Sequence, residues 1–287
     1  MKEKEIRDIE LDLLIESLLR RHGHDFRHYA RASFKRRVKS MAKKLGVDHI
    51  SDIIPPILRD DAAINDFLRE MSITVTEMFR DPDFFAAVRE KVLPYLGSYP
   101  FLKIWHAGCA TGEEVYAMAI VLKEGGLYRR SRIYGTDFNN DSLHKAGEGI
   151  YPLDKMKRYM VNYNRSNPKA SFSDYYHAGY KSAKMSDDLR EFITFANHNL
   201  VTDGVFGEMN LIVCRNVMIY FDKDLQNRVL RLFHDSLCHR GFLCLGPKES
   251  LRFSDVVDDF EVVSKKEKIF RKRRLSSKSK YLRKEII

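Results

Sequence analysis

The apolar positions of the first 70 residues recur at helical spacing. Over residues 5–22, five apolar side chains fall on one face of a predicted helix: Ile6, Ile9, Leu13, Leu14 and Leu18. A second helix is predicted over 26–45 and a third over 61–71. The pattern therefore indicates a small all-helical domain at residues 1–72.

At residue 100 the pattern changes to short apolar runs that alternate with helical segments. Strands are predicted at Leu102–His106, Arg132–Asp137, Phe192–Ala196, Leu211–Cys214 and Phe242–Leu245. Helices are predicted between them, over 112–124, 140–147 and 223–238. Such alternation is typical of an α/β fold, in which a doubly wound parallel sheet has helices on both faces.

Two segments depart from this alternation. Residues 152–190 are rich in Tyr, Asn, Ser and Lys, which indicates an inserted subdomain. Residues 260–263 and 268–271 are expected to form a terminal antiparallel hairpin. The expected organisation is completed by a linker at 73–99 that includes the first helix of the second domain, the α/β domain itself at 100–272 and a basic tail at 273–287.

Composition limits the class of protein. Hydrophobic residues make up 44% of the 287, which suffices for a substantial core, and the apolar runs are too short to span a bilayer. No signal peptide is expected, because the first residues are charged throughout. The four cysteines form no CxxC pair and the ten histidines are scattered, so we expect no metal, no disulfide framework and a reducing cytoplasm.

The formal net charge of +10 is concentrated in two places. Residues 265–287 hold 11 Lys or Arg against 2 Asp or Glu. The second predicted helix, with Asp25 as its N-terminal cap and Gly46 at its end, carries a run without acids: Arg27, Arg31, Lys35, Arg36, Arg37, Lys39, Lys43 and Lys44. The remainder of the chain is nearly neutral, which weakens the first interpretation of the charge, a nucleic-acid partner.

A turn of small residues joins the first predicted strand to the next helix. Within it, Gly108 and Gly112 permit a tight turn and a close approach of a ligand to the backbone. The following strand ends at Asp137, where an acid can accept hydrogen bonds from both hydroxyls of a ribose. The pattern indicates a nucleoside cofactor, although a tight turn without a ligand would have the same glycines.

Two glutamates, Glu113 and Glu114, open the helix after this turn. The full GxGxxG pattern and the P-loop Gly-Lys-Ser/Thr are both missing. Carboxylates here would repel a pyrophosphate, but they suit a cofactor with a positive charge and no phosphate, such as S-adenosylmethionine. The charges favour a methyltransferase over a dehydrogenase, unless the glutamates only complement the helix dipole.

Four segments together resemble the chemotaxis receptor methyltransferases of the CheR family. They are MSITVTEMFRDPDFF (71–85), HAGCATGEEVYAMA (106–119), YGTDFNNDSLHKAGEGIY (134–151) and CRNVMIYFDKDLQNRVL (214–230). The resemblance implies a Rossmann-like class I methyltransferase domain with a small inserted β-subdomain, preceded by an all-helical domain. It also implies methyl transfer from S-adenosylmethionine to glutamate side chains of chemoreceptors, giving γ-methyl esters and S-adenosylhomocysteine.

The resemblance also implies the residues that hold the cofactor. By motif position they are Thr74, Thr76, Arg80, Gly108, Glu113, Glu114, Asp137, Asn199, Leu200, Cys214, Arg215 and Asn216. The chain departs from the family pattern at three places. Many relatives have Asn where Thr74 stands, Val115 replaces a usual Pro, and residues 246–250 replace a more usual Gly-His-Ser-Glu.

Arg215 and Tyr220 match the signature beside the transferable methyl and are assigned to catalysis. A glutamate carboxylate, with an ordinary pKa of about 4.3, is ionised at neutral pH, so the reaction needs alignment rather than a general base. A guanidinium can hold a carboxylate with two hydrogen bonds, and a tyrosine hydroxyl can lie near the nucleophile. The alternatives are a structural ion pair for Arg215 and simple packing for Tyr220.

The basic run offers a surface for the acidic helices of such receptors. Its expected docking residues are Arg36, Arg37, Lys43 and Lys44, and the alternative is a solvated basic face. The implied partner is the cytoplasmic helical domain of a chemoreceptor, and a receptor tail peptide at the inserted subdomain is left open. The tail at 273–287 suggests an anionic membrane surface or acidic receptor helices. We expect a cytoplasmic monomer recruited to membrane receptor arrays.

Two other classes of protein are weighed against this one. A nucleic-acid methyltransferase would fit the charge, but neither an Asn/Asp-Pro-Pro-Tyr-like motif nor a Pro-Cys motif is present, so no nucleic-acid partner is expected. A non-catalytic scaffold is disfavoured because Glu114, Asp137, Arg215 and Tyr220 are all intact.

Overall fold

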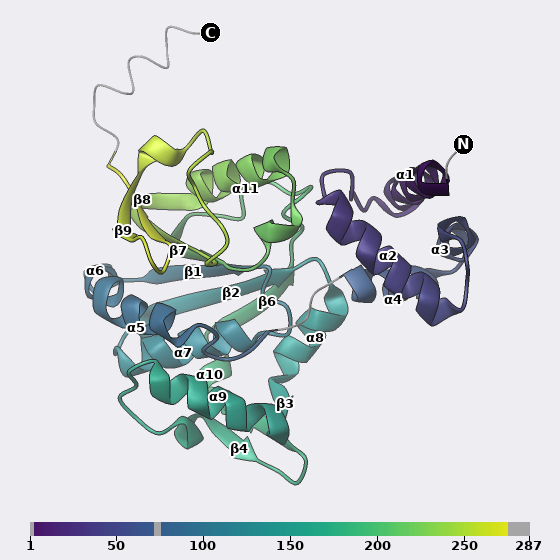
Figure 1. Cartoon of the computed structure of the whole chain (residues 1–287). Helices are drawn as coiled ribbons and strands as arrows, with labels where there is room; N and C mark the ends of the chain where they lie inside the picture. Colours follow the sequence, from purple (N-terminus) through teal and green to yellow (C-terminus); the bar gives the residue numbers. More distant parts are fainter. Residues whose placement is uncertain (1–2, 72–75, 275–287) are drawn as a thin grey trace, which may run out of the picture.

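The N-terminal part of the chain is helical. The computed structural model describes residues 3–71 and 76–274 (Figure 1). The helices of the first part are α1 (Glu3–His22), α2 (Arg31–Leu45), α3 (Ile54–Arg59) and α4 (Asp61–Met71), with a 3-10 turn at Ile50–Ile53. Their apolar sides meet in one core. The predicted all-helical character is confirmed, and α4 has the predicted bounds.

The buried face of α1 differs from the predicted one. Three of the five residues predicted to share that face are 41–56% exposed: Ile6, Ile9 and Leu13. The helix instead buries Leu11 and Ile15 beside Leu14 and Leu18, against α3 and the 3-10 turn. Apolar residues lie on two sides of α1, so spacing cannot identify the side that packing selects.

The second helix begins at Arg31, five residues later than predicted, and Asp25 does not cap it. The Asp25 carboxylate instead binds the Arg27 side chain at 2.8 Å. The backbone at 28–30 pairs with 220–222, since the Ala30 N–H donates to the Tyr220 carbonyl at 2.7 Å and the Asp222 N–H to that of His28 at 2.8 Å. This antiparallel bridge excludes a helix there. The predicted end at Gly46 is confirmed, with φ +68°.

The second part is built on a seven-stranded sheet. Its strands are β1 (Leu102–Ala107), β2 (Ser131–Asp137), β6 (Ile193–Asn197), β7 (Met209–Cys214), β8 (Leu237–Leu245), β9 (Phe260–Ser264) and β10 (Ile269–Lys272). The order is β6-β2-β1-β7-β8-β10-β9, with the first five parallel. The five predicted strands and the terminal hairpin β9–β10 are confirmed. The hairpin adds an antiparallel edge, so the sheet is mixed.

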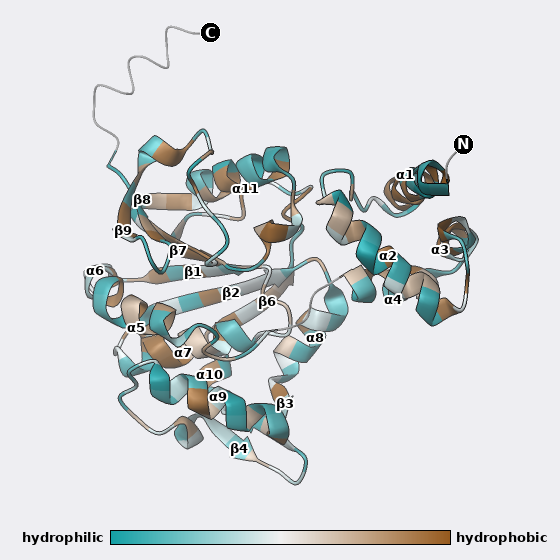
Figure 2. Ribbon diagram, viewed as in Figure 1, coloured by the Kyte–Doolittle hydropathy of each residue, from teal (hydrophilic) through white to brown (hydrophobic). Residues whose placement is uncertain are grey.

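Helices cover both faces of this sheet (Figure 1). One face packs on α11 (Lys223–Ser236), and the other on α5 (Pro82–Lys91) and α7 (Glu113–Glu124). Figure 2 shows hydrophobic colour on α7 and β8, and hydrophilic colour on much of α2 and α9. The remaining helices of this layer are α6 (Leu93–Leu96), α8 (Asn140–Glu148) and α10 (Asp187–Arg190). No helix in the described ranges combines the length and apolar character needed to cross a membrane.

A second, three-stranded antiparallel sheet lies in the region predicted as an insertion. Its order is β3 (Ile150–Pro152), β5 (Ser182–Met185) and β4 (Tyr176–Ala178). The 13-residue helix α9 (Leu153–Arg165) joins β3 to the rest and packs against α5. This helix was not predicted, although it buries Met156, Tyr159 and Tyr163 on one side.

Candidate active site

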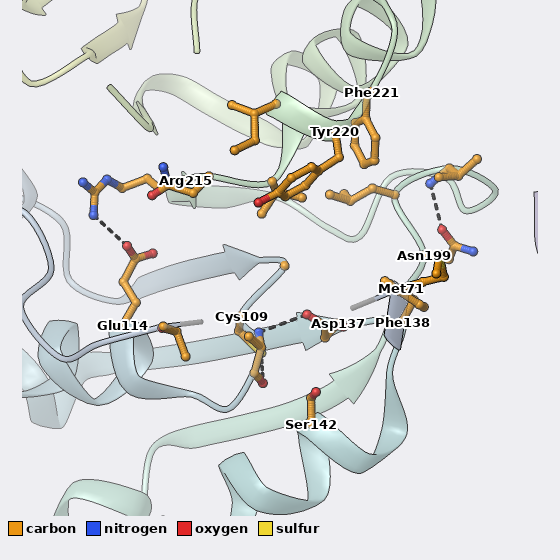
Figure 3. A pocket seen from close by; sticks show the side chains of 18 of the residues that line it. Met71, Cys109, Glu114, Asp137, Phe138, Ser142, Asn199, Arg215, Tyr220 and Phe221 are labelled. Carbon is orange, nitrogen blue, oxygen red and sulfur yellow. Dashed lines mark hydrogen bonds and ion pairs between the residues drawn. The ribbon is translucent and has the colours of Figure 1, made fainter. Parts of the chain in front are cut away.

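A cavity lies at the carboxyl ends of β1, β2 and β7, where the sheet meets the helical part (Figure 3). The chain leaves β1 toward β2 on one side, and β7 pairs with β1 on the other. Such a reversal of strand order opens a crevice in which α/β proteins bind ligands. The cavity walls also include residues of the helical part, of the segment after it and of the loops that follow β6 and β7.

Gly108 lets the turn after β1 pass directly against the loop after β7. Its φ is +75°, and a Cβ at this position would lie 2.5 Å from Val217 Cγ2. The Gly108 and Cys109 N–H groups both donate to the Thr136 carbonyl, at 2.8 and 2.9 Å. The requirement for glycine is therefore steric as well as conformational, and it brings main chain to the cavity wall.

Asp137 ends β2 with its carboxylate at the cavity. Oδ2 accepts a hydrogen bond from the Ala110 N–H at 3.0 Å (Figure 3). Oδ1 accepts one from the Asn139 N–H, also at 3.0 Å. The residue is 9% exposed, and this burial raises the pKa of its carboxyl group. The lone pairs that remain can accept hydrogen bonds from hydroxyl groups of a ligand.

A chain of charged side chains includes two residues of the cavity wall, Glu114 and Arg215. Glu114 Oε2 accepts from Arg215 Nη1 at 2.8 Å (Figure 3). Glu114 Oε1 lies 3.2 Å from His106 Nδ1. Arg215 Nη2 donates to Asp81 Oδ2 at 2.6 Å. Burial opposes ionisation of Glu114, but His106 and Arg215 outweigh it and hold its pKa below the ordinary value.

Arg215 lines the cavity with its guanidinium already engaged. The side chain is 2% exposed, its carbon Cζ lies 4.1 Å from the Phe84 ring centroid, and two carboxylates bind its nitrogens. The structure therefore shows the ion pair that the sequence left as the alternative for this residue. Both terminal nitrogens of Arg215 are already bound to carboxylates, so this geometry does not leave a free guanidinium to hold a substrate carboxylate.

Glu113 does not line the cavity, in contrast to the position that the resemblance implies for it. Its buried carboxylate accepts from Thr111 Oγ1 at 2.6 Å and from the Tyr159 hydroxyl at 3.1 Å. Successive helical residues point about 100° apart, so Glu113 and Glu114 face different neighbours. Burial raises the pKa of Glu113, and the two hydroxyl donors offset this only in part.

The helical part closes one side of the cavity. Tyr29 and Phe221 both line it, with ring centroids 5.3 Å apart. Arg37 of α2 also lines it: the guanidinium lies 4.6 Å from the Tyr220 ring centroid and donates to the Met71 carbonyl. A cation over a tyrosine face is a favourable contact. Arg37 therefore belongs to the cavity wall, whereas the sequence placed it on an outer basic surface.

The other predicted docking residues do lie on the outside of α2. Arg36 and Lys43 are exposed, and Lys44 is exposed and paired with Glu70. Two further cations of the basic run, Arg31 and Lys35, bind carboxylates of α1 at 2.5 Å. The basic surface is therefore smaller than the sequence predicts.

Most of the remaining predicted residues line the cavity: Thr76, Arg80, Asn199, Leu200, Asn216 and Tyr220. Cys214 does not, because this last residue of β7 is fully buried in the core that packs on α11. Thr74 lies outside the described residues.

Tyr29 lines the cavity but lies in none of the four quoted segments. It is in the helical part, far along the chain from Phe221, and reaches the cavity through a tertiary contact that no local pattern reveals. Met71 and Phe138 lie within the quoted segments and also line the cavity, but the sequence assigned them no role.

The strand order, the antiparallel edge and the cavity at the carboxyl ends define a class I methyltransferase fold joined to a helical domain. Two family models match the chain: the all-alpha domain of CheR methyltransferase over residues 9–72, and the SAM-binding domain of CheR methyltransferase over 74–269. The chain belongs to the CheR methyltransferase family. Its cofactor is S-adenosylmethionine.

Named relatives agree with this family. The chain is 49% identical, over 92% of its length, to a methyltransferase named Cher3 from Pseudomonas putida, of which 97% is covered. It is 29% identical over 86% of its length to a chemotaxis protein methyltransferase of Listeria innocua, of which 92% is covered. Among solved structures, the N-methyltransferase NodS of Bradyrhizobium japonicum with S-adenosyl-L-homocysteine aligns at TM-score 0.34 and 14% identity, over 60% of this chain and 63% of that one.

Proposed function

We propose that this chain transfers methyl groups from S-adenosylmethionine to glutamate side chains of chemoreceptors, which gives glutamate γ-methyl esters. Family membership supports the proposal, because relatives from Listeria innocua and Vibrio cholerae are chemotaxis protein methyltransferases. The structural observation that carries it is the position of Arg37. A basic helix, α2, contributes this cation to the wall of the cavity in the SAM-binding domain.

The cavity residues fit S-adenosylmethionine. Asp137 has lone pairs for the ribose hydroxyls, and Glu114 supplies negative charge for a ligand that carries an ammonium and a sulfonium. Leu200 and Phe138 offer apolar contact for an adenine ring. Four further lining residues are proposed contacts: Thr76, Arg80, Asn199 and Asn216. Glu113 and Cys214 lie behind this first layer.

The proposed reaction needs no proton transfer by the protein. The bound cofactor supplies an electrophilic methyl group on a sulfonium. An oxygen of the ionised substrate glutamate forms the new C–O bond, the C–S bond breaks, and its electron pair goes to sulfur. The chain therefore has to align the carboxylate and limit its hydration, which the apolar side chains of Val217 and Ile219 favour.

Tyr220 and Arg215 receive different roles in this proposal. Tyr220 lines the cavity beneath Arg37 and is the proposed catalytic residue at the nucleophile. Arg215 is bound to Glu114 and Asp81, so we assign it to holding the Glu114 carboxylate in place. Its effect on methyl transfer then passes through the cofactor site.

Receptor docking is proposed for the exposed side of α2. Arg36, Lys39 and Lys43 are exposed there and would meet acidic receptor helices. We also propose that the protein works as a monomer at membrane receptor arrays. The basic tail from residue 273 would then add an electrostatic contact to receptor helices or anionic lipid.

The test is incubation of the purified chain with methyl-labelled S-adenosylmethionine and membranes that contain the receptors of its own cell. Base-labile label on a receptor is expected, because carboxyl methyl esters hydrolyse in base and methylated amines do not. Receptors whose methylated glutamates are replaced by alanine serve as the control. A folded protein that binds S-adenosylhomocysteine but labels none of these receptors would contradict the proposed substrate.

A further inference from the structure

We propose that Glu249 is a positioning residue for the cofactor site. Its buried carboxylate holds the loop after β7 in the shape that the cavity requires. Glu249 does not line the cavity, and the family resemblance does not imply a role for it. The inference rests on the cofactor site and is independent of the identity of the methyl acceptor.

The Glu249 carboxylate accepts hydrogen bonds from four backbone N–H groups. Oε1 accepts from Val217 at 2.9 Å and from Met218 at 2.8 Å. Oε2 accepts from Asn216 at 3.2 Å and from Gly246 at 2.6 Å. A carboxylate has about four acceptor sites, so this one is used as a template for main chain and has little capacity left to bind a ligand.

The loop that Glu249 holds forms one wall of the cavity. Asn216, Val217, Ile219 and Tyr220 all line it. Asn216 has φ +62°, a left-handed conformation that glycine and asparagine adopt more readily than other residues. Three consecutive N–H donors, beginning with that of Asn216, bind the carboxylate. These bonds hold the left-handed turn and set the direction in which the loop leaves β7.

Tight packing makes the position of the loop critical. Val217 lies so close to Gly108 that a Cβ on this glycine would be 2.5 Å from it. A Cβ on Gly246 would lie 2.7 Å from both the Asn216 nitrogen and Glu249 Oε2. A shift of the loop by a fraction of an ångström would therefore move it against the cofactor turn or away from it.

The loop is anchored independently at its far end. There the backbone of Tyr220 and Asp222 bonds to His28 and Ala30, and the His28 ring lies 2.9 Å from the Asp222 carboxylate. Glu249 is thus the anchor on the sheet side. Its carboxylate is buried, and burial raises its pKa. A neutral amide in its place could not satisfy all four donors.

The test variant is Glu249→Gln, measured by the dissociation constant of S-adenosylhomocysteine in calorimetry. Whichever way the glutamine amide is turned, its NH₂ group faces two N–H donors and can accept from neither. We expect at least a tenfold weaker affinity, with the KM for S-adenosylmethionine raised to match. The matched control is Glu10→Gln, a buried glutamate of α1 that accepts from Ser51. It should leave the dissociation constant unchanged.

Gly246→Ala is the second variant, for the case that Glu249→Gln does not fold. It keeps the carboxylate but displaces it from the loop, and it should weaken S-adenosylhomocysteine binding in the same direction. If the variants that fold bind with wild-type affinity, the inference is overturned, even where their thermal midpoints fall. Binding is measured without a receptor. Failure of receptor labelling with wild-type binding would therefore count against the proposed substrate alone.

Discussion

Replacement of Arg215 by alanine should destabilise the fold as well as stop methyl transfer. The Arg215 side chain is 2% exposed and contacts Glu114 at 2.8 Å and Asp81 at 2.6 Å. Removal of the guanidinium leaves the Glu114 carboxylate in the cavity wall with His106, 3.2 Å away, as its remaining partner in this chain of charges. That contact is an ion pair only when the imidazole is protonated.

The size of the effect follows from the exposure of the two carboxylates. Removal of one partner from a buried ion pair costs about 3–5 kcal/mol. The Asp81 side chain is 42% exposed and can be solvated, whereas that of Glu114 is 19% exposed. We therefore expect a loss near the lower limit, about 3 kcal/mol in the free energy of unfolding, out of a total of about 5–15 kcal/mol.

The assay is urea unfolding followed by tryptophan fluorescence. Trp105 is the only tryptophan of the chain and is fully buried in the central strand β1. A double-mutant cycle with Glu114→Gln isolates the ion pair, with an expected coupling of about 2 kcal/mol. Asp81→Asn changes the exposed partner and serves as the control, with a cost below about 1 kcal/mol.

One result would refute this reasoning. If Arg215→Ala unfolds within about 0.5 kcal/mol of the wild type and the cycle shows no coupling, the ion pair is not structural. Loss of methyl transfer in that variant would then return Arg215 to the role of holding the substrate carboxylate.

Three further predictions follow from the site. Tyr220→Phe should lower the turnover number at least tenfold, by removal of the hydroxyl beside the nucleophile, and leave S-adenosylhomocysteine affinity unchanged in calorimetry; unchanged turnover would contradict its role. Glu113→Gln should raise the free energy of unfolding near neutral pH. Burial raises the pKa of the Glu113 carboxyl in the folded state above its ordinary value, so the wild type loses stability as the pH rises through the folded-state pKa, whereas the glutamine variant does not. Urea midpoints that differ by the same amount in acid and at neutral pH would refute this. Arg36→Glu with Lys43→Glu should raise the KM for receptor severalfold at low salt and less at high salt; charge reversal of the exposed Lys103 and Arg129, near the amino ends of β1 and β2, is the control.

Much of the fold could be predicted because its determinants are local. Apolar runs of strand length predicted the five parallel strands, and Gly46 predicted the end of α2 through its left-handed conformation. The helix α9 was missed because its Lys, Asn and Tyr content resembles a loop. Only contact with α5 and the second sheet shows which side of α9 is buried, because that side is formed largely by tyrosines.

Motif spacing was informative for the site where main chain sets the geometry. Gly108 and Asp137 lie at the cavity because a strand end and a tight turn place them there. The same reasoning grouped Glu113 with Glu114, although neighbouring residues of a helix face different sides. It also gave Arg215 a free guanidinium, because no pattern indicates that Asp81 lies 2.6 Å away.

The sequence by itself determined the class of fold, the cofactor turn and the excess of basic residues on α2. Each of these features depends on residues that are close together in the sequence, within one helix, one strand or one turn. The tertiary structure decided which charges are free: it paired Arg215, Arg31 and Lys35 with carboxylates and brought Arg37 into the cavity. Charge pairing acts over a few ångströms between segments far apart in the chain, so only the folded structure shows which cations remain available to a substrate.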